Sequence, residues 1–220
     1  MYARQMFDVE LEELSAALIT MGAMATESID KTIMAINTGN RQMAETVFKG
    51  DDLIDDMEKK IEHRCLRLLL KQQPVASDLR KISTAIKMIT DIERIGDASS
   101  DIAEICMSCE NSPTGELLED ITKMAEAGRS MVSDSIKAYV DEDLELAKKT
   151  IDADDIVDDY FDSIKTILID KIRTEPERSG DFIDYLMIIK YLERIGDHAV
   201  NICEWVQFYK TGMHKNERIV

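Results

Sequence analysis

The chain contains the same five-residue string twice, and this repeat constrains the fold more than any other feature. Glu-Arg-Ile-Gly-Asp occupies residues 93–97 and again residues 193–197, a spacing of 100. An acidic string recurs as well: Asp-Asp-Leu-Ile-Asp-Asp at 51–56 is matched by Asp-Asp-Ile-Val-Asp-Asp at 154–159, a spacing of 103. Two matched pairs in one chain indicate internal duplication. We therefore expect two similar halves, with a shorter connection between the two strings in the second half.

Apolar residues recur every three or four positions along both halves, which is the spacing of amphipathic helices. Turn-forming residues interrupt this pattern at Gly39 and at Gln72-Gln73-Pro74-Val75, and Pro176 interrupts the second half where Pro74 interrupts the first. The expected helices span residues 8–37, 40–71, 76–109, 115–140, 143–173 and 178–210. Each half is therefore predicted to contain three helices.

The densest run of turn formers, Asn111-Ser112-Pro113-Thr114-Gly115, lies half-way along the chain and marks a boundary. The predicted domains are residues 1–111 and 112–220. The predicted fold class is all-α, with two tandem three-helix bundles related by an internal pseudo-repeat. We expect the halves to superpose helix for helix and each to have its own core.

The composition excludes several classes of protein. The net charge of −17 is opposite to the basic footprint that nucleic acid or an anionic membrane surface requires, and it suits basic partners or cations. No apolar run approaches the roughly 18 residues of a membrane span, and the first residues lack the apolar segment of a signal peptide. We expect a cytoplasmic protein with no membrane span and no nucleic-acid partner.

Acidic side chains at helical spacing form two rows in each half. On a helix, Glu93, Asp97 and Asp101 would share one face, as would Glu193, Asp197 and Asn201. The middle helix of each half adds a pair of aspartates four residues apart. The candidate metal ligands are Asp51, Asp55, Glu93, Asp97 and Asp101 in the first half and Asp154, Asp158, Glu193, Asp197 and Asn201 in the second.

The two rows of one half are expected to face each other, because Asp55 and Glu93 lie equally far from Pro74 in an antiparallel helix pair. Converging carboxylates repel by kilocalories per mole and need neutralisation. A metal ion would provide it, and oxygen ligands favour iron, magnesium or manganese over zinc. The alternative is a solvated acidic face balanced by nearby basic residues such as Arg94 and Arg194.

Two glycines, a pair of cysteines and one histidine lie within or close to the acidic rows in the sequence. Gly96 and Gly196 each cost roughly 1 kcal/mol within a helix, which suggests a close helix contact at that level. Cys106 and Cys109 form a lone CxxC with no second ligand pair, so buried structural cysteines are the simpler interpretation. His198 follows Asp197 directly and is a weaker candidate for a position beside a metal.

The string Gln-Gln-Pro-Val-Ala-Ser-Asp-Leu-Arg at 72–80, followed by Asp-Ile-Glu-Arg-Ile-Gly-Asp at 91–97, resembles the PhoU family, and 192–202 resembles the second PhoU motif. The resemblance covers nearly the whole chain. It implies a cytoplasmic accessory of phosphate-specific ABC transporters that negatively regulates phosphate-starvation signalling. It also implies a homodimer that links the transporter's ATP-binding subunit to a phosphate-responsive sensor histidine kinase. Its acidic motifs would hold metal ions, including multinuclear iron clusters, or magnesium, manganese or zinc.

Two other functions remain open from the residues alone. A carboxylate-bridged di-iron or metal-storage protein would need Glu-x-x-His on two helices, and no such motif is present. The residues three before His63, His198 and His214 are Lys60, Ile195 and Thr211. A purely structural helical interaction protein, with solvated acidic rows, is the other alternative. No nucleophile–base set is recognisable, so we do not expect an enzyme.

Overall fold

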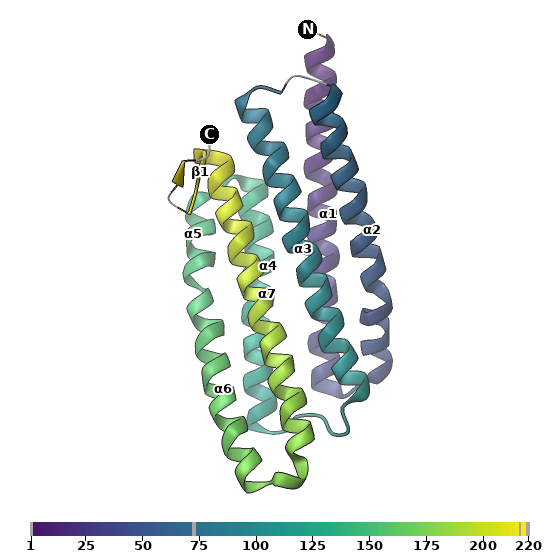
Figure 1. The fold of residues 1–220 in the computed structure, drawn as a ribbon, viewed down its shortest axis with the longest axis vertical. Coiled ribbons are helices and arrows are strands. Elements are labelled where there is room, and N and C mark those ends of the chain that lie inside the picture. The colour runs from purple at the N-terminus through teal and green to yellow at the C-terminus, as the bar shows by residue number, and fades with distance from the viewer. Residues whose placement is uncertain (1, 72–73, 216, 219–220) are drawn as a thin grey trace.

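The computed structural model describes residues 2–71, 74–215 and 217–218, and it shows two three-helix bundles side by side (Figure 1). The first bundle consists of α1 (Tyr2–Thr38), α2 (Arg41–Lys71) and α3 (Ala76–Ser108). The second consists of α4 (Glu116–Asp141), α5 (Leu144–Asp152) continued by α6 (Asp154–Thr174), and α7 (Ser179–Thr211). A short 3-10 helix, η1 (Pro176–Arg178), precedes α7, and a two-residue hairpin of β1 (Met213–His214) and β2 (Glu217–Arg218) follows it. The predicted all-α class with tandem three-helix bundles is confirmed.

The middle helices of the two bundles begin with equivalent caps. The Asn40 side-chain oxygen accepts hydrogen bonds from the backbone N–H groups two and three residues ahead, at 3.0 and 3.1 Å. The Asp143 side chain does the same at the start of α5, at 3.0 Å to both groups. Each side chain satisfies N–H groups that have no partner inside the helix. Asn40 and Asp143 are 103 residues apart, the spacing of the acidic strings, so the duplication extends to the local chemistry of helix initiation.

The expected single helix over 143–173 is wrong, because the structure interrupts it at Ala153. The Ala153 N–H group donates both to the Lys149 carbonyl at 3.1 Å and to the Thr150 carbonyl at 3.2 Å, so the last turn of α5 tightens. Helix α6 then begins with Asp154 and an adjacent aspartate in its first turn. Negative side chains are favoured there by the positive end of the helix dipole.

The connections agree with the turn signals that the sequence contains. Gly39 ends α1 with φ +63°, a left-handed conformation that is strained for a residue with a side chain. Pro74 and Val75 are non-helical, and Gln72 and Gln73, part of the same predicted break, lie outside the described residues. Pro176 begins η1 between α6 and α7, at the corresponding point of the second half.

The expectation of two separate cores is wrong. Buried apolar side chains from all seven α-helices form one continuous cluster, which extends from Phe7 in α1 to Val206 in α7. Helix α1 packs against α4, and α3 packs against α7. Fourteen of the 33 residues of α3 are buried but only three of the 21 in α6, so α3 is central while α6 is covered on one side. The apolar spacing gave no indication of which neighbouring helix covers each buried residue.

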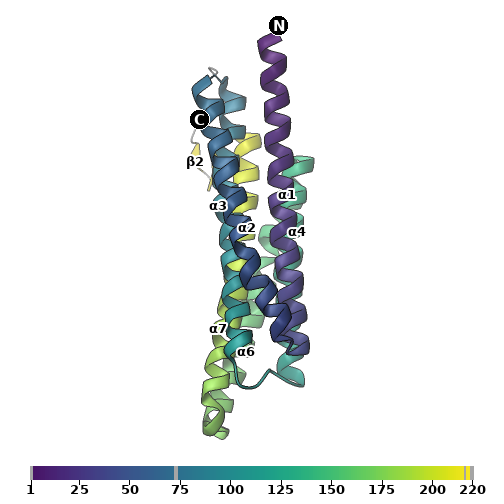
Figure 2. The same cartoon turned by 90° about the vertical axis from the view of Figure 1, so that its right-hand side faces the viewer.

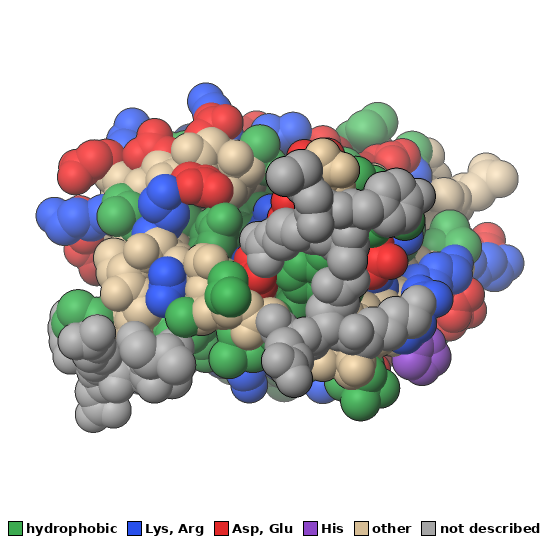
Figure 3. Space-filling model, turned by 90° about the horizontal axis from the view of Figure 1, so that it is seen from above, with side chains coloured by type: hydrophobic (Ala, Val, Ile, Leu, Met, Phe, Trp, Pro, Cys, Tyr) green, Lys and Arg blue, Asp and Glu red, His purple; other side chains and the backbone are tan. Residues whose placement is uncertain are grey.

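The molecule is elongated and flat, and the start of α1 extends beyond the other helices (Figure 2). From the end that carries both termini, acidic and basic side chains surround hydrophobic ones that are visible towards the middle (Figure 3). Within the described residues, no helix combines the length and the apolar character needed to cross a membrane.

Candidate metal centre

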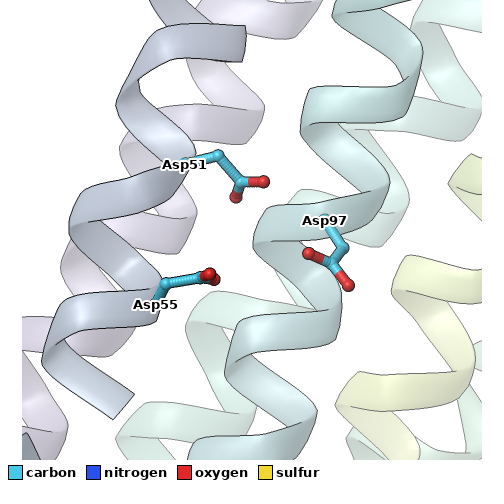
Figure 4. A group of neighbouring side chains, drawn as sticks. All are labelled: Asp51, Asp55 and Asp97. Atoms are coloured by element: carbon cyan, nitrogen blue, oxygen red, sulfur yellow. The ribbon is translucent and has the colours of Figure 1, made fainter. Parts of the chain in front are cut away.

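Three aspartates of the first bundle point toward one another across the contact between α2 and α3. Asp51 and Asp55 lie one turn apart on α2, and Asp97 approaches them from α3 (Figure 4). One oxygen of each carboxylate lies within 4.8 Å of one oxygen of both others, and all three side chains are half-buried. Among the described residues, this is the only group of three or more carboxylate, histidine or cysteine side chains that converges this closely. The predicted meeting of the two acidic rows is thus present.

The surroundings of Asp51 make its carboxyl group costly to ionise. Burial, followed by the negative charges of Asp97 and Asp55, raises the Asp51 pKa to about 6, and a hydrogen bond with Ser100 opposes this. A carboxylate that shares its surroundings with two others is costly to ionise. A bound cation would reverse this effect and hold all three groups in the ionised form.

Glu93, one turn before Asp97 on α3, contributes an oxygen with an unsatisfied bonding requirement. Its Oε2 atom is buried and has no hydrogen-bond partner, although the Arg94 Nε atom lies 3.3 Å away in an orientation that gives only an ion pair. Burial first, then the Asp97 charge, raises the Glu93 pKa to about 7, while Arg94 opposes the shift. A buried carboxylate oxygen without a donor fits a metal ligand, because the metal supplies the missing partner.

Two basic side chains already neutralise part of this charge. Arg94 Nη1 lies 2.7 Å from Asp97, and Lys59 Nζ lies 3.9 Å from Asp55. Both basic side chains are about half exposed or more, at 48% and 62%, so both can move into solvent if a cation replaces them. The group is therefore partly balanced, and Glu93 Oε2 still has no hydrogen-bond donor.

The two repeated glycines provide space for carboxylates as well as for a close helix contact. A Cβ atom on Gly96 would lie 3.1 Å from Asp51 Oδ1 and 2.9 Å from Ile54 Cδ1. A Cβ atom on Gly196 would lie 2.9 Å from Asp154 Oδ1. In each half the glycine thus allows the first aspartate of the acidic string to lie over the last helix of its bundle.

The second bundle repeats the group in a looser form. Burial, then the charges of Asp158, Asp197 and Glu193, raises the Asp154 pKa to about 6. The pKa values of Asp158 and Asp197 are also raised, in both cases chiefly by burial. Asp158 is exposed, however, and Lys190 forms an ion pair with Glu193. The four carboxylates influence one another electrostatically but do not converge as those of the first bundle do.

The third row positions, Asp101 and Asn201, lie at the contact between the bundles. Asp101 accepts a hydrogen bond from Tyr191 on α7, which lowers its pKa, although burial raises that pKa more. Asn201 donates to Asp91 on α3 at 3.2 Å, and His198 Nδ1 lies 2.9 Å from the same Asp91 oxygen. These side chains therefore connect α3 and α7. Asp91 belongs to neither acidic row, so the spacing of the rows gave no sign of this contact.

The CxxC pair lies at the end of α3, away from the acidic groups. Both thiols are free, and burial raises the pKa of Cys106 to about 12 and that of Cys109 to about 11. Thiols with such pKa values remain protonated and unreactive at neutral pH. Cys109 Sγ instead donates to the Asn111 carbonyl at 2.8 Å, in keeping with a structural role.

Fold and site together define a class: a helical protein of two tandem three-helix bundles, with one group of carboxylates where the middle and last helices of each bundle meet. The family model described as the PhoU domain matches residues 18–106 and again residues 121–206, once in each bundle. These matches cover most of the chain. The chain belongs to the PhoU family.

Similar proteins match along almost the full length. A phosphate-specific transport system accessory protein PhoU homolog of Clostridium acetobutylicum is 38% identical, over 95% of this chain and 96% of the relative. A phosphate-specific transport system accessory protein PhoU homolog of Thermotoga maritima is 34% identical, over 96% of this chain and 91% of the relative. The crystal structure of PhoU from Pseudomonas aeruginosa superposes with a TM-score of 0.90 at 30% identity, covering 94% of this chain and 100% of that one. The crystal structure of the phosphate transport system regulatory protein PhoU from Streptococcus pneumoniae superposes with a TM-score of 0.86 at 28% sequence identity. It covers 94% of this chain and 98% of that one.

Proposed function

We propose that the protein is a non-enzymatic accessory protein of a phosphate transport system and a negative regulator of the response to phosphate starvation. The observation that carries this proposal is the PhoU domain match in both bundles, together with relatives of that description aligned over nearly the whole chain. The place of action would be the cytoplasm. Residues 1–111 and 112–220 would be its two domains, joined by the shared core.

The acidic groups would be metal sites. In the first bundle Asp51, Asp55, Glu93 and Asp97 would hold the metal. This is supported by the convergence of the three aspartates and by the buried Glu93 oxygen that has no hydrogen-bond donor. Iron, including a multinuclear cluster, magnesium, manganese or zinc would supply the positive charge. The corresponding residues of the second bundle are Asp154, Asp158, Glu193 and Asp197. Lys190 would have to release Glu193 there, so this site would be the weaker of the two.

Regulation would operate through binding. As a homodimer, the protein would contact the ATP-binding subunit of the transporter and a sensor histidine kinase, and thereby couple transport to signalling. A chain with a net charge of −17 is suited to partners with basic surfaces. A metal at the contact between α2 and α3 would fix these helices in one arrangement by removing the repulsion between their carboxylates.

A complementation experiment tests the regulatory role. The gene would be deleted in its host, and a reporter of phosphate-starvation genes would be measured in phosphate-rich medium. We expect the reporter to become active in the deletion strain and to be silenced again by the wild-type chain. Co-purification of the ATP-binding subunit with the tagged protein would identify the physical partner. A silent reporter in the deletion strain, with unchanged phosphate uptake, would exclude the proposed role.

A further inference from the structure

Two grooves on the outer surface occupy equivalent places in the two bundles. The first lies between α1 and α2 and encloses about 120 Å³, and the second lies between α4 and the α5–α6 pair and encloses about 230 Å³. All eight residues that line the second groove lie 103 positions after residues that line the first. Met24 corresponds to Ala127, for example, and Gly50 to Ala153. The duplication has therefore preserved a surface feature that is separate from the acidic groups.

In the first groove, Gly50 forms a floor that has no side chain, and Leu53 forms an exposed apolar wall beside it. A Cβ atom on Gly50 would meet no atom within 4 Å, so helix packing does not require the glycine. A glycine within a helix is nevertheless unfavourable. The wall is formed by Leu53, which is 62% exposed, and its counterpart Ile156 in the second groove is 52% exposed. An open floor beside an exposed aliphatic side chain has the shape of a socket for a side chain from another molecule.

Around both grooves, acidic side chains outnumber basic ones by the same margin. Glu27 and Lys31 line the first groove and form an ion pair at 2.8 Å, and Asp52 and Asp56 are exposed beside Leu53 on α2. Asp134 and Lys149 line the second groove, and Asp155 and Asp159 are exposed beside Ile156. Each groove thus has three carboxylates and one ammonium group. In the described part of the chain, none of the four exposed aspartates forms an ion pair.

We infer that each groove binds a basic amphipathic segment of a partner protein, with an aliphatic side chain inserted over Gly50 or Ala153 and lysine or arginine residues facing the exposed aspartates. The apolar walls account for the aliphatic side chain, and the unbalanced carboxylates account for the basic residues. An amphipathic helix in a groove between two helices is an established mode of recognition. Two equivalent grooves on one chain would bind two such segments. This inference goes beyond the regulatory role and does not depend on bound metal.

A synthetic leucine–lysine peptide with helical periodicity, about 14 residues or four turns long, is the probe. Isothermal titration calorimetry would measure its binding to the wild type, to Gly50→Leu and to Gly180→Leu. Gly180 is the matched control, because it is also a helical glycine whose Cβ would meet no atom within 4 Å. We expect two peptides per wild-type chain, one per Gly50→Leu chain and two per Gly180→Leu chain. Leu53→Ala, which removes the apolar wall without filling the floor, should weaken one of the two binding events.

The charges are tested separately. Asp52→Asn/Asp56→Asn should weaken one binding event by about fivefold, as expected for the loss of two exposed charge contacts. Glu116→Gln/Glu119→Gln, two exposed acids outside both grooves, should leave both events unchanged. If the wild type and Gly50→Leu bind the same number of peptides, the interaction is general charge attraction and the inference is overturned. The absence of any binding to the wild type would also overturn it. A change of oligomeric state in Gly50→Leu would assign the groove to a second copy of this chain and also overturn it.

Discussion

At the scale of single residues, Gly96 and Gly196 make room for the first aspartate of each acidic string. Replacing Gly96 by alanine improves helix propensity, but its Cβ would overlap Ile54, which is buried in the core, and press on Asp51. Gly50→Ala is the matched control, since its Cβ would lie in open space. We expect Gly96→Ala to be less stable than Gly50→Ala by about 1–3 kcal/mol, the usual cost of overpacking. Urea denaturation of metal-free protein measures the difference. Equal stability of Gly96→Ala and Gly50→Ala would show that Ile54 and Asp51 move aside to accommodate the added methyl group without a cost in stability.

The raised carboxylate pKa values predict how the stability of metal-free protein depends on pH. Glu93 has an ordinary pKa of 4.5 and a value of about 7 in the folded protein, so folding favours its protonated form. Its contribution to stability is therefore fully present below about 4.5 and is lost as the pH rises through about 7. The pKa values of Asp51 and Asp154 are raised to about 6, so these groups also make the folded protein less stable as the pH rises.

Thermal melts in the presence of a chelator check whether stability falls as the pH rises. We expect a higher melting temperature near pH 5.5 than near pH 8. Glu93→Gln, which imitates the protonated side chain, should reduce the difference, whereas Glu116→Gln on the exposed surface should not. Melting temperatures that rise from pH 5.5 to pH 8 in the wild type would show that Glu93 is not held in the surroundings described here.

At the scale of helices, the equivalent caps Asn40 and Asp143 offer a test of the repeat. Each side chain satisfies two backbone N–H groups at the start of the middle helix of its bundle. Asn40→Ala and Asp143→Ala should each cost about 0.5–2 kcal/mol of unfolding free energy. Asn40→Asp and Asp143→Asn should be nearly neutral, because each retains a side-chain acceptor. A loss in only one half would mean that the two helix starts are not energetically equivalent.

The sequence could predict much of this level of structure, because helices follow from local spacing and proline and glycine end them locally. The break at Ala153 was missed, since alanine is the best helix former and gives no local signal for an interruption. The meeting of the acidic rows of α2 and α3 was predictable from the antiparallel arrangement around Pro74, which places Asp55 level with Glu93. That Asp97 converges most closely with Asp51 and Asp55 was not predictable. The turning of Asn201 toward the other bundle was not predictable either, because it depends on the packing of α3 against α7.

At the scale of the whole molecule, the shared core predicts cooperative unfolding of both bundles. Trp205 on α7 is the only tryptophan, and it reports on the contact between the bundles: Lys87 of α3 lies 5.7 Å from its ring centre and Thr84 donates to its carbonyl. We expect urea transitions measured by tryptophan fluorescence and by helical circular dichroism to coincide. Separate transitions would show that the bundles unfold as independent domains, despite the continuous cluster of buried side chains.

The assignment of the acidic groups as metal sites is the central claim, and the metal content of purified protein tests it most directly. Elemental analysis would compare the wild type with Asp51→Asn/Asp97→Asn, with Asp154→Asn/Asp197→Asn, and with the control Asp52→Asn/Asp56→Asn. The control removes two aspartates from the same acidic string that are exposed on the outer face of α2. All samples would be supplied with iron, manganese, magnesium and zinc. We predict bound metal in the wild type and the control, loss of the first bundle's share in Asp51→Asn/Asp97→Asn, and loss of a smaller share in Asp154→Asn/Asp197→Asn. A wild-type protein that retains none of the four metals would contradict the claim and leave these carboxylates as a solvated acidic surface.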